Sequence, residues 1–294
     1  MSEMLARRAW EAIDNASRRL AAAGIESSRL DAELLLAVAA GITREAVVIG
    51  SINLSTYVTK VFDSLVARRE KREPIAYILG HKEFYSLDFE VSPAVLIPRP
   101  ESEFVVGVAL EFIADKADAR VLDIGTGSGA IAIAIAVNAP RARVTAVDIS
   151  ADALAIAARN AKRNRVEDRV TLRRGDCFGV LDGGPALETF DVIASNPPYL
   201  DDAEIAALEP DVRGYEPRLA MAAGVGGLDI LRRIVSGASS YLASDGELIL
   251  EVAVGQAAVV VKLVEAAGLR VVAVINDFAG HPRVVRARRI HGGG

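Results

Sequence analysis

Residues 121–129 read VLDIGTGSG, an apolar run that ends in three closely spaced glycines. Glycine allows tight turns and close approach of a ligand to the backbone, so the stretch predicts a buried strand, a glycine loop and a helix over 129–138. Dinucleotide-binding loops have the spacing G-x-G-x-x-G, whereas this loop has G-x-G-x-G. Asp123, just before the loop, disfavours a phosphate and favours a cation. A sulfonium with an amino-acid tail meets both conditions.

Strands and helices alternate on both sides of this loop. The pattern predicts a mainly parallel sheet covered on both faces, and a final antiparallel pair because the last two strands are joined by a link too short for a crossover helix. We expect strands at 119–124, 143–148, 169–173, 190–195, 247–252, 269–276 and 282–288, and helices near 102–115, 129–138, 151–163, 227–242 and 256–267.

Acidic residues end two of these strands. Asp148 lies nineteen positions after Gly129, where a carboxylate can accept hydrogen bonds from two ribose hydroxyls. Asp176 suits an adenine amino group, with Cys177 or Phe178 covering the ring, although an Asp at this position is also a common turn former. Because no histidine lies near Cys177 in the sequence, we interpret it as a small apolar wall and not as a nucleophile.

The fourth strand, 190–195, runs into Asn196-Pro197-Pro198-Tyr199. Proline lacks a backbone donor and has a fixed φ, so the two prolines end the strand in a stiff turn at the sheet edge where ligands bind in open α/β sheets. An ordinary strand-ending turn is the simpler interpretation of these four residues alone. A cofactor site at the same edge favours a functional one.

Composition limits the class of protein. The chain has 294 residues, a formal charge of −5, a pI near 5.4, one cysteine and three histidines. Two domains are expected from the length, and the acidic balance argues against a general nucleic-acid binder, although a local basic groove stays open. An intrachain disulfide is impossible, and no metal site is expected. Without a long apolar segment, we expect a soluble cytoplasmic protein that does not bind membranes.

Residues 1–73 are predicted to form a helical bundle. One helical stripe contains Leu5, Ala9, Ile13 and Ala16, a second contains Leu30, Leu34 and Val38, and a third contains Val58, Phe62, Leu65 and Val66. Thr43 and Ser55 suit helix caps, and so does Ser27 or Ser28. The charged run at 68–72 is either a solvated helix face or a docking surface for an acidic or RNA-rich partner.

Residues 74–100 predict a hairpin-like connector that leads to a stiff helix entry at Ile97-Pro98-Arg99-Pro100-Glu101-Ser102-Glu103. The domain assignment is therefore a bundle at 1–73, a connector at 74–100 and a catalytic domain at 101–294. Arg99 stands where connector and catalytic domain meet.

The glycine loop, the acidic strand ends and the Asn-Pro-Pro-Tyr turn resemble the class I S-adenosylmethionine-dependent methyltransferases, which have a Rossmann-like seven-stranded sheet. The segments REPIAYILGHKEF (72–84), IPRPESE (97–103) and YEPRLA (215–220), with Gly226-Gly227-Leu228, are similar to the HemK family of release factor glutamine methyltransferases. Three positions depart from that pattern: Ser86 and Ala253 replace usual glycines, and Cys177 replaces a bulky residue, so the packing around adenine differs.

This resemblance implies methyl transfer from S-adenosylmethionine to the side-chain amide nitrogen of the Gly-Gly-Gln glutamine of class I peptide chain release factors, with S-adenosylhomocysteine as product. A monomer and docking of the release factor on the bundle are expected. Catalysis is assigned to Asn196, Pro197 and Tyr199, and substrate binding to Asn196, Pro197, Pro198, Tyr199 and Arg99. Cofactor binding is assigned to Asp123, Gly125, Thr126, Gly127, Ser128, Gly129, Asp148, Ile149, Asp176, Cys177, Phe178 and Asn196.

Other activities share the same turn. An enzyme that methylates a base amino group of a nucleic acid, or a glutamine of a ribosomal protein, would also need to hold a planar nitrogen. A nucleotide-responsive binding module would keep the glycine loop but would not need residues 196–199. The acidic pI and the lack of a long basic domain weigh against the nucleic-acid alternative.

Overall fold

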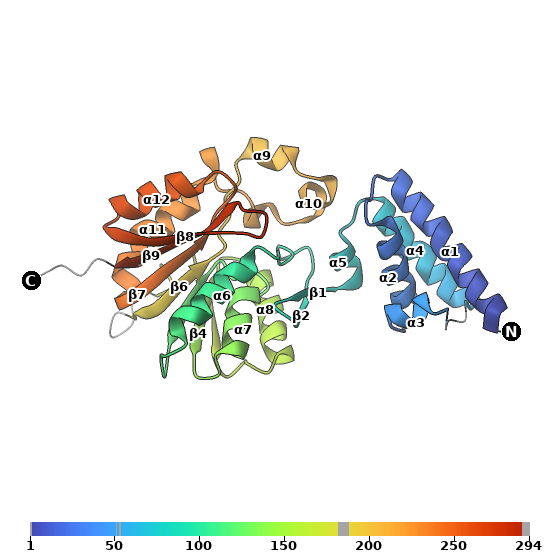
Figure 1. Ribbon diagram of the computed structural model, residues 1–294, viewed down its shortest axis with the longest axis horizontal. Helices are drawn as coiled ribbons and strands as arrows, with labels where there is room; N and C mark the ends of the chain where they lie inside the picture. Colours follow the sequence, from blue (N-terminus) through green and yellow to red (C-terminus); the bar gives the residue numbers. More distant parts are fainter. Residues whose placement is uncertain (1, 51, 53, 182–187, 290–294) are drawn as a thin grey trace, which may run out of the picture. The chain divides into compact units, whose positions relative to one another are not determined.

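The computed structural model describes residues 2–50, 52, 54–181 and 188–289, which form two compact units (Figure 1). The helical unit comprises Met1–Gly80 and Glu209–Tyr215, and the sheet unit comprises His81–Leu208 and Glu216–Gly294. The contacts therefore divide the predicted connector, whose hairpin groups with the sheet unit. They also assign a short segment that follows the Asn-Pro-Pro-Tyr turn to the helical unit.

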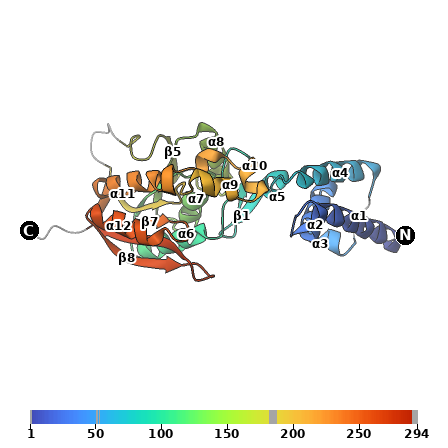
Figure 2. The same ribbon diagram turned by 90° about the horizontal axis from the view of Figure 1, so that it is seen from above.

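The helical unit has a separate hydrophobic core. Its helices are α1 (Ser2–Ala22), α2 (Ser28–Ala40), α3 (Arg44–Val48), α4 (Thr56–Glu70), α5 (Ile75–Leu79) and α10 (Pro210–Tyr215). Helix α2 packs against both α1 and α4 (Figures 1 and 2). Thr43 and Ser55 cap α3 and α4 as predicted, because each side chain accepts a hydrogen bond from a backbone N–H three residues later. Ser27 precedes α2 without making a side-chain cap.

The predicted stripe of α2 is wrong. Leu30 and Val38 are exposed, whereas Ala32, Leu35, Leu36 and Ala39 are buried. Both sets have helical spacing, and the choice between them was made by the packing of α1 and α4, which a period of 3.6 residues does not specify. The stripes of α1 and α4 are better predicted: Ala9, Ile13, Ala16, Phe62 and Val66 are buried, while the side chain of Leu5 lies outside the described residues.

The charged run at the end of α4 is a solvated face only in part, because Lys71 is exposed whereas Arg69 and Arg72 are engaged in ion pairs. Arg69 is 6% exposed, and its guanidinium donates to Asp31 (2.7 Å) and to Asp211 (2.6 Å). Arg72 also pairs with Asp211, and Arg68 pairs with Glu73. These cations therefore stabilise the helical unit itself and hold α10 within it.

The sheet unit contains a seven-stranded sheet of order β5-β4-β3-β6-β7-β9-β8. Neighbouring strands are parallel from β5 to β7, and β9 is antiparallel to both β7 and β8, which confirms the predicted doubly wound fold with an antiparallel end. The strands are β3 (Arg120–Ile124), β4 (Arg143–Asp148), β5 (Val170–Arg174), β6 (Phe190–Ser195), β7 (Leu242–Glu251), β8 (Leu269–Asn276) and β9 (Pro282–Arg289).

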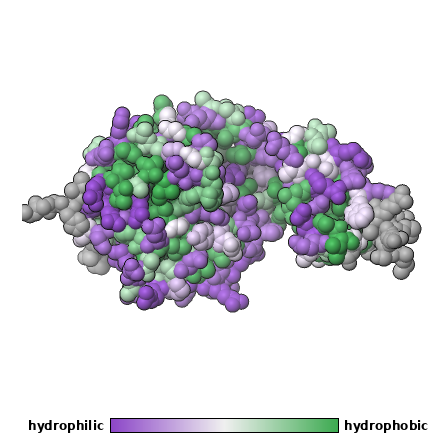
Figure 3. Space-filling model, in the orientation of Figure 1, coloured by the Kyte–Doolittle hydropathy of each residue, from purple (hydrophilic) through white to green (hydrophobic). Residues whose placement is uncertain are grey.

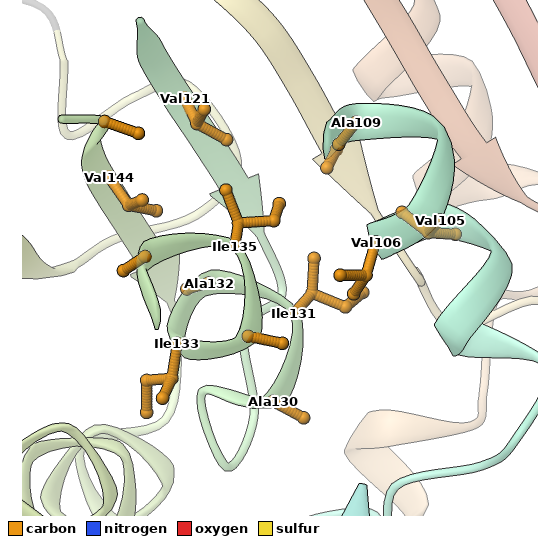
Figure 4. Packing of buried hydrophobic residues seen from close by; sticks show 14 of the residues in the cluster. Val105, Val106, Ala109, Val121, Ala130, Ile131, Ala132, Ile133, Ile135 and Val144 are labelled. Atoms are coloured by element: carbon orange, nitrogen blue, oxygen red, sulfur yellow. The ribbon is translucent and has the colours of Figure 1, made fainter. Parts of the chain in front are cut away.

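Helices cover both faces of this sheet. One face carries α6 (Ser102–Ile113), α7 (Ala130–Asn138) and α8 (Ala151–Arg163), and the other carries α11 (Asp229–Tyr241) and α12 (Ala257–Ala266) (Figure 1). Every residue of α7 from Ala130 to Ala136 is buried, as expected for a helix that is apolar all round. In Figure 4, Ile131 of α7 points toward Val106 of α6, and Ile135 points toward Val121 of β3.

The predicted hairpin consists of β1 (His81–Phe84) and β2 (Leu87–Glu90). Its two turn residues, Tyr85 and Ser86, have φ angles of 51° and 59°, as a two-residue hairpin turn of type I′ requires. Ser86 thus adopts a conformation that glycine would adopt with less strain. The turn is also held by Glu103, whose carboxylate accepts from the Tyr85 N–H at 2.8 Å.

Several short elements between β6 and α11 were not predicted. They are α9 (Asp202–Ala207), η1 (Arg218–Ala220) and η2 (Val225–Gly227), in addition to α10. The signal for α9 was present in the sequence, because Asp201 and Glu204 form a complete capping box. Just after the Asn-Pro-Pro-Tyr turn, an isolated bridge joins Leu200 to Ala222.

The edge strand β8 alternates between half-buried and exposed residues. Val272 and Val274 are exposed on it, as is Val259 on α12, and Figure 3 shows apolar side chains gathered over these two elements. Within the described ranges, no helix combines the length and the apolar character needed to cross a membrane.

Candidate active site

A cavity of about 270 Å³ opens at the carboxyl ends of β3, β4 and β6. Ligands bind at this edge in open α/β sheets. Twelve of the residues assigned to the site from the sequence line the cavity: Arg99, Gly125, Thr126, Gly127, Ser128, Asp148, Ile149, Asp176, Cys177, Asn196, Pro197 and Pro198. The other four assigned residues, Asp123, Gly129, Phe178 and Tyr199, do not line the cavity.

The glycine loop between β3 and α7 has the conformation that its sequence requires. Gly125, Gly127 and Gly129 have φ angles of 73°, 56° and 82°. At Gly129 a side chain would also collide with Ile133, since a Cβ there would lie 2.7 Å from its Cδ1 atom. Asn160 of α8 supports the loop from below by donating to the Ser128 carbonyl at 2.9 Å. Gly129 therefore shapes the loop without touching the cavity.

Asp123 is buried beneath the loop. Its Oδ2 accepts from the Thr126 hydroxyl (2.6 Å) and from the Ala132 N–H (3.2 Å), and its Oδ1 has no hydrogen-bond partner. Burial raises the pKa of this carboxyl to about 7, and the nearby charge of Asp148 adds to the shift. The ionised form of this carboxyl places a negative charge behind the loop, and a cationic ligand in front of the loop would favour that form.

Asp148 ends β4 with both oxygens anchored. Oδ2 accepts from the Gly127 N–H and Oδ1 from the Ser150 N–H, each at 2.8 Å. Burial raises the pKa of Asp148 above its usual value, partly offset by these two backbone donors. Each carboxylate oxygen can accept a second hydrogen bond, so the residue can hold two vicinal hydroxyls at the cavity wall. Ile149 beside it is exposed and supplies an apolar surface.

The corner after β5 separates the three residues assigned to it. Asp176 and Cys177 line the cavity, and Asp176 pairs with Arg233 of α11 at 2.9 Å. Phe178 turns away, because its ring stacks on Tyr241 with centroids 4.6 Å apart. Cys177 is therefore left beside the cavity as the wall residue, and burial raises the pKa of its thiol to about 11.

Long-range hydrogen bonds position the Asn-Pro-Pro-Tyr turn. Ser195, just before it, donates to the Ile124 carbonyl at 2.6 Å and so joins the ends of β6 and β3. The Asn196 side-chain amide donates from Nδ2 to the Ser102 hydroxyl at 2.9 Å. Because Nδ2 is engaged there, Oδ1 is the end of the amide that remains to accept a hydrogen bond from a ligand.

Tyr199 anchors the far side of the turn. Its hydroxyl donates to Glu251 at 3.3 Å, and its backbone carbonyl accepts from Gln256 at 2.8 Å. Burial raises the pKa of Tyr199, so the phenol remains a neutral donor. Gly227 packs directly against this carbonyl, since a Cβ there would lie 2.1 Å from the Tyr199 oxygen.

Arg99 lies on the cavity wall and pairs with the buried Glu216, whose second oxygen accepts from the Ile97 N–H at 3.0 Å. Sequence reasoning included Arg99 but assigned no role to Glu216, Ser102, Glu251 or Gln256. Ser102 and Glu216 lie inside the segments 97–103 and 215–220 already singled out. Glu251 follows a run of apolar residues at the end of a strand. An acidic residue in that position is the sequence feature that could have predicted a buried functional carboxylate.

The polar groups of this cavity fit S-adenosylmethionine. The paired acceptors of Asp148 match a ribose diol, the carboxylates of Asp123 and Asp148 favour a cation, and the apolar Ile149 and Cys177 suit the faces of a planar base. The cavity continues to the Asn196 turn, so a methyl donor and an amide acceptor can share it.

Comparisons with known proteins agree with this geometry. A family model described as the PrmC N-terminal domain matches residues 11–80, and the methyltransferase small domain model matches residues 107–209. A release factor glutamine methyltransferase of Geobacter sulfurreducens is 43% identical over 270 residues, which cover 92% of each chain. One of Moorella thermoacetica is 42% identical over 281 residues, covering 95% of this chain and 98% of the relative.

Among solved structures, a ribosomal protein L11 methylase from Lactobacillus delbrueckii has a TM-score of 0.50 at 19% identity. The match covers 68% of this chain and 84% of that one. At this level of identity the likeness concerns the fold, which is that of a methyltransferase with a Rossmann-like sheet.

Proposed function

The chain belongs to the release factor glutamine methyltransferase family, and from this membership we propose that it methylates the side-chain amide nitrogen of a release factor glutamine. The relatives cover nearly the whole chain, including both units. The observation that carries the proposal is the Asn196 amide, held through Nδ2 by Ser102 in the same cavity as the glycine loop and Asp148.

The cofactor of this reaction is proposed to be S-adenosylmethionine, which when bound supplies a methyl group on a sulfonium and leaves as S-adenosylhomocysteine. Asp148 would hold the ribose hydroxyls, and the glycine loop would lie against the amino-acid tail. Asp176, with the backbone N–H of Cys177, would contact the adenine edge. The ring of Phe178 would not cover the adenine, because it stacks on Tyr241.

The turn at 196–199 has the groups needed to orient an amide. A carboxamide nitrogen is a weak nucleophile because its lone pair is delocalised, so positioning is the main contribution of the enzyme. Asn196 Oδ1 and the Pro197 carbonyl would each accept one N–H of the glutamine, and Tyr199, which donates to Glu251 outside the cavity lining, would hold the turn in place. The two acceptors bind more strongly as the nitrogen gains positive charge, which stabilises the transition state more than the bound substrate.

No general base is needed before transfer, because the nitrogen loses its proton readily only after it has gained the methyl group. Pro197 and Pro198 keep the turn stiff, so the acceptors do not have to reorganise during the reaction. Arg99, paired with Glu216, would contact the acceptor polypeptide at the cavity wall.

The preferred glutamine is proposed to be that of the Gly-Gly-Gln motif in class I peptide chain release factors. The helical unit, with its separate core, would bind a second surface of the release factor. Trp10 and Tyr57 are exposed aromatic residues on this unit, and exposed aromatics are frequent anchors of protein interfaces.

Mass spectrometry of a purified release factor, after incubation with the protein and S-adenosylmethionine, tests the function. We expect one added methyl group on the Gly-Gly-Gln glutamine, and none with the Asn196→Ala variant. Methylation of a ribosomal-protein glutamine or of a nucleic-acid base in parallel incubations, with the release factor unmodified, would contradict the proposal.

The docking role has a separate test. Deletion of residues 1–72 would also remove Arg69 and Arg72, the partners of Asp211. Single substitutions at the surface of the unit leave these ion pairs intact and are therefore the better test. Trp10→Ala and Tyr57→Ala should raise KM for the whole release factor and leave KM for a short Gly-Gly-Gln peptide unchanged. An equal rise for both substrates would argue against docking on this unit.

A further inference from the structure

A buried carboxylate lies behind the acceptor end of the cavity. Glu251, the last residue of β7, is 1% exposed. Its Oε2 accepts from the Ser102 hydroxyl at 2.6 Å, and its Oε1 accepts from the Tyr199 hydroxyl at 3.3 Å. Ser102 in turn accepts from Asn196 Nδ2 at 2.9 Å. One carboxylate is therefore connected to both polar side chains of the Asn-Pro-Pro-Tyr turn.

Three elements that are distant in sequence bring these groups together. Ser102 begins α6, Asn196 follows β6, and Glu251 ends β7, the parallel neighbour of β6. Ser195 lies opposite Leu250 in the register, so the residues that follow them, Asn196 and Glu251, emerge side by side at the sheet edge. The helix start of α6 then inserts the Ser102 hydroxyl between them.

The direction of each hydrogen bond follows from the chemistry of the groups. A carboxylate only accepts, and a serine hydroxyl has a single proton. When that proton is donated to Glu251, the Ser102 oxygen can only accept, and the one donor on the Asn196 side chain is Nδ2. The amide is then oriented with Oδ1 toward the ligand. A neutral group at position 251 would allow the opposite direction, with Ser102 donating to Oδ1 and the NH₂ of Asn196 facing the substrate NH₂.

We propose that Glu251 is a positioning residue: through Ser102 it sets the orientation of the Asn196 side-chain amide, so that an acceptor and not a donor faces the substrate nitrogen. The proposal rests on the proposed methylation of an amide. It assigns to Ser102 a task beyond starting α6, and it explains why a carboxylate is buried at the end of β7.

The surroundings of Glu251 favour a group that titrates in the working range. Burial raises the pKa of its carboxyl to about 7, with Glu101 adding to the shift and Ser102, Tyr199 and the charge of Arg283 opposing it. Arg283 of β9 is itself held by Asp277 at 3.0 Å. Loss of the negative charge on Glu251 below pH 7 should therefore remove the constraint on Ser102 and reduce turnover.

Glu251→Gln tests the proposal, because glutamine preserves the size of the side chain and can donate to Ser102. We expect kcat for release factor methylation to fall by about 100-fold, as for a misplaced reacting group. Affinity for S-adenosylhomocysteine should be unchanged, and the decline of activity below pH 7 should be lost. A wild-type kcat and pH profile in this variant would overturn the proposal.

Ser102 provides an independent pair of variants if Glu251→Gln folds poorly. Ser102→Thr keeps the hydroxyl and should retain most turnover, whereas Ser102→Ala should match Glu251→Gln. A readout besides activity is the side-chain NH₂ resonance of Asn196, assigned through Asn196→Asp, which should lose its hydrogen-bonded shift in Ser102→Ala and in Glu251→Gln. Equal activity in the threonine and alanine variants would contradict the proposal that Glu251 orients Asn196 through the Ser102 hydroxyl.

Glu247→Gln is a matched control on the same strand. Glu247 is also buried, but its partners are Arg286 and Arg288, far from the turn along β7. This variant should lower the unfolding temperature without changing kcat per folded molecule. If the wild-type protein fails to methylate any release factor, the proposed function is wrong. If the wild type succeeds and Glu251→Gln is equally active, the positioning role alone is wrong.

Discussion

The two ends of the cavity are built differently. At the cofactor end, the partners in each hydrogen bond are close in sequence. Asp123 and Thr126 are 3 positions apart, Asp148 and Gly127 are 21 apart, and Asn160 and Ser128 are 32 apart. At the acceptor end, Asn196 is held by a residue 94 positions away, and Tyr199 by residues 52 and 57 positions away. The cofactor end depends on one strand–loop–helix unit and its neighbour, whereas the acceptor end depends on the assembly of the whole sheet.

This difference predicts that variants at the two ends have separable effects. Changes at the acceptor end should lower kcat and leave cofactor affinity intact. Changes at the cofactor end should weaken binding of the cofactor and leave kcat at saturation nearly unchanged.

The largest separation is expected for Asn196→Ala. Loss of the side-chain acceptor should lower kcat by about 10²–10³-fold, the usual effect of removing one preorganised polar group from a reacting centre. Calorimetric titration with S-adenosylhomocysteine should give nearly the wild-type Kd. A large loss of cofactor affinity in this variant would show that the two ends are not independent.

The converse variant is Asp148→Ala. The carboxylate holds the Gly127 and Ser150 N–H groups, so its removal disturbs the loop and deletes the acceptors for the ribose. Affinity for S-adenosylhomocysteine should fall by about 10–100-fold, in line with hydrogen bonds to a charged group. Single-turnover rates at saturating S-adenosylmethionine should remain close to wild type, and a fall comparable to that of Asn196→Ala would contradict the separation.

Gly227→Ala tests whether distant packing controls the acceptor end. A Cβ at this position would collide with the Tyr199 carbonyl and lie 2.8 Å from the Gln256 amide nitrogen. Displacement of the turn should lower kcat by about tenfold. The Kd for S-adenosylhomocysteine, measured by titration, should not change.

Gly226→Ala is the control for this variant. Gly226 has nearly the same positive φ, 69° against 67°, but a Cβ there would meet nothing within 4 Å. It should cost about 1–2 kcal/mol of stability from backbone strain and leave kcat unchanged. Similar kcat values for the two variants would mean that strain, and not the collision with Tyr199, is responsible.

The last prediction lies outside the comparison of kcat with cofactor affinity, and it concerns Asp123 and the dependence of stability on pH. Its folded-state pKa of about 7 lies above the unfolded value, so the folded chain binds more protons between about pH 4 and 7, and stability falls as the pH rises through this window. Asp123→Asn should remove up to about 1.4 kcal/mol per pH unit of this slope. Thermal unfolding between pH 4 and 8 measures it. An unchanged slope would mean that Asp123 is charged in the folded protein throughout this range.

The fold was largely predictable because local patterns specified most of it. The strands of the large sheet, and the helices α6, α7, α8, α11 and α12, lie at or within a few residues of their predicted positions, except that β7 begins at Leu242, five residues before its predicted start. The region between β6 and α11 was not predicted. Its short helices have too few residues for a periodic pattern, and they are stabilised by contacts with distant segments.

The buried face of α2 and the ion pairs of Arg69 were missed for a related reason. Leu30 and Leu35 fit helical stripes equally well, and a basic helix end has the same sequence whether water or Asp211 surrounds it. The two carboxylates that pair with Arg69 are 38 and 142 residues away from it in the sequence.

By itself the sequence determined the glycine loop, the acid at the end of β4, the proline-stiffened turn after β6 and the family to which the chain belongs. These features can be predicted from the sequence because each depends on local residues. Glycine and proline determine the backbone conformation at their own positions, and an acid at the end of a strand is recognised from the apolar run before it. Only the tertiary structure decided that Phe178 turns away from the cavity, that Ser102 and Glu251 hold Asn196, and that Gly227 closes against Tyr199. Each of these depends on which side chains meet across the sheet edge, and such meetings are set by strand register and helix packing, not by local sequence.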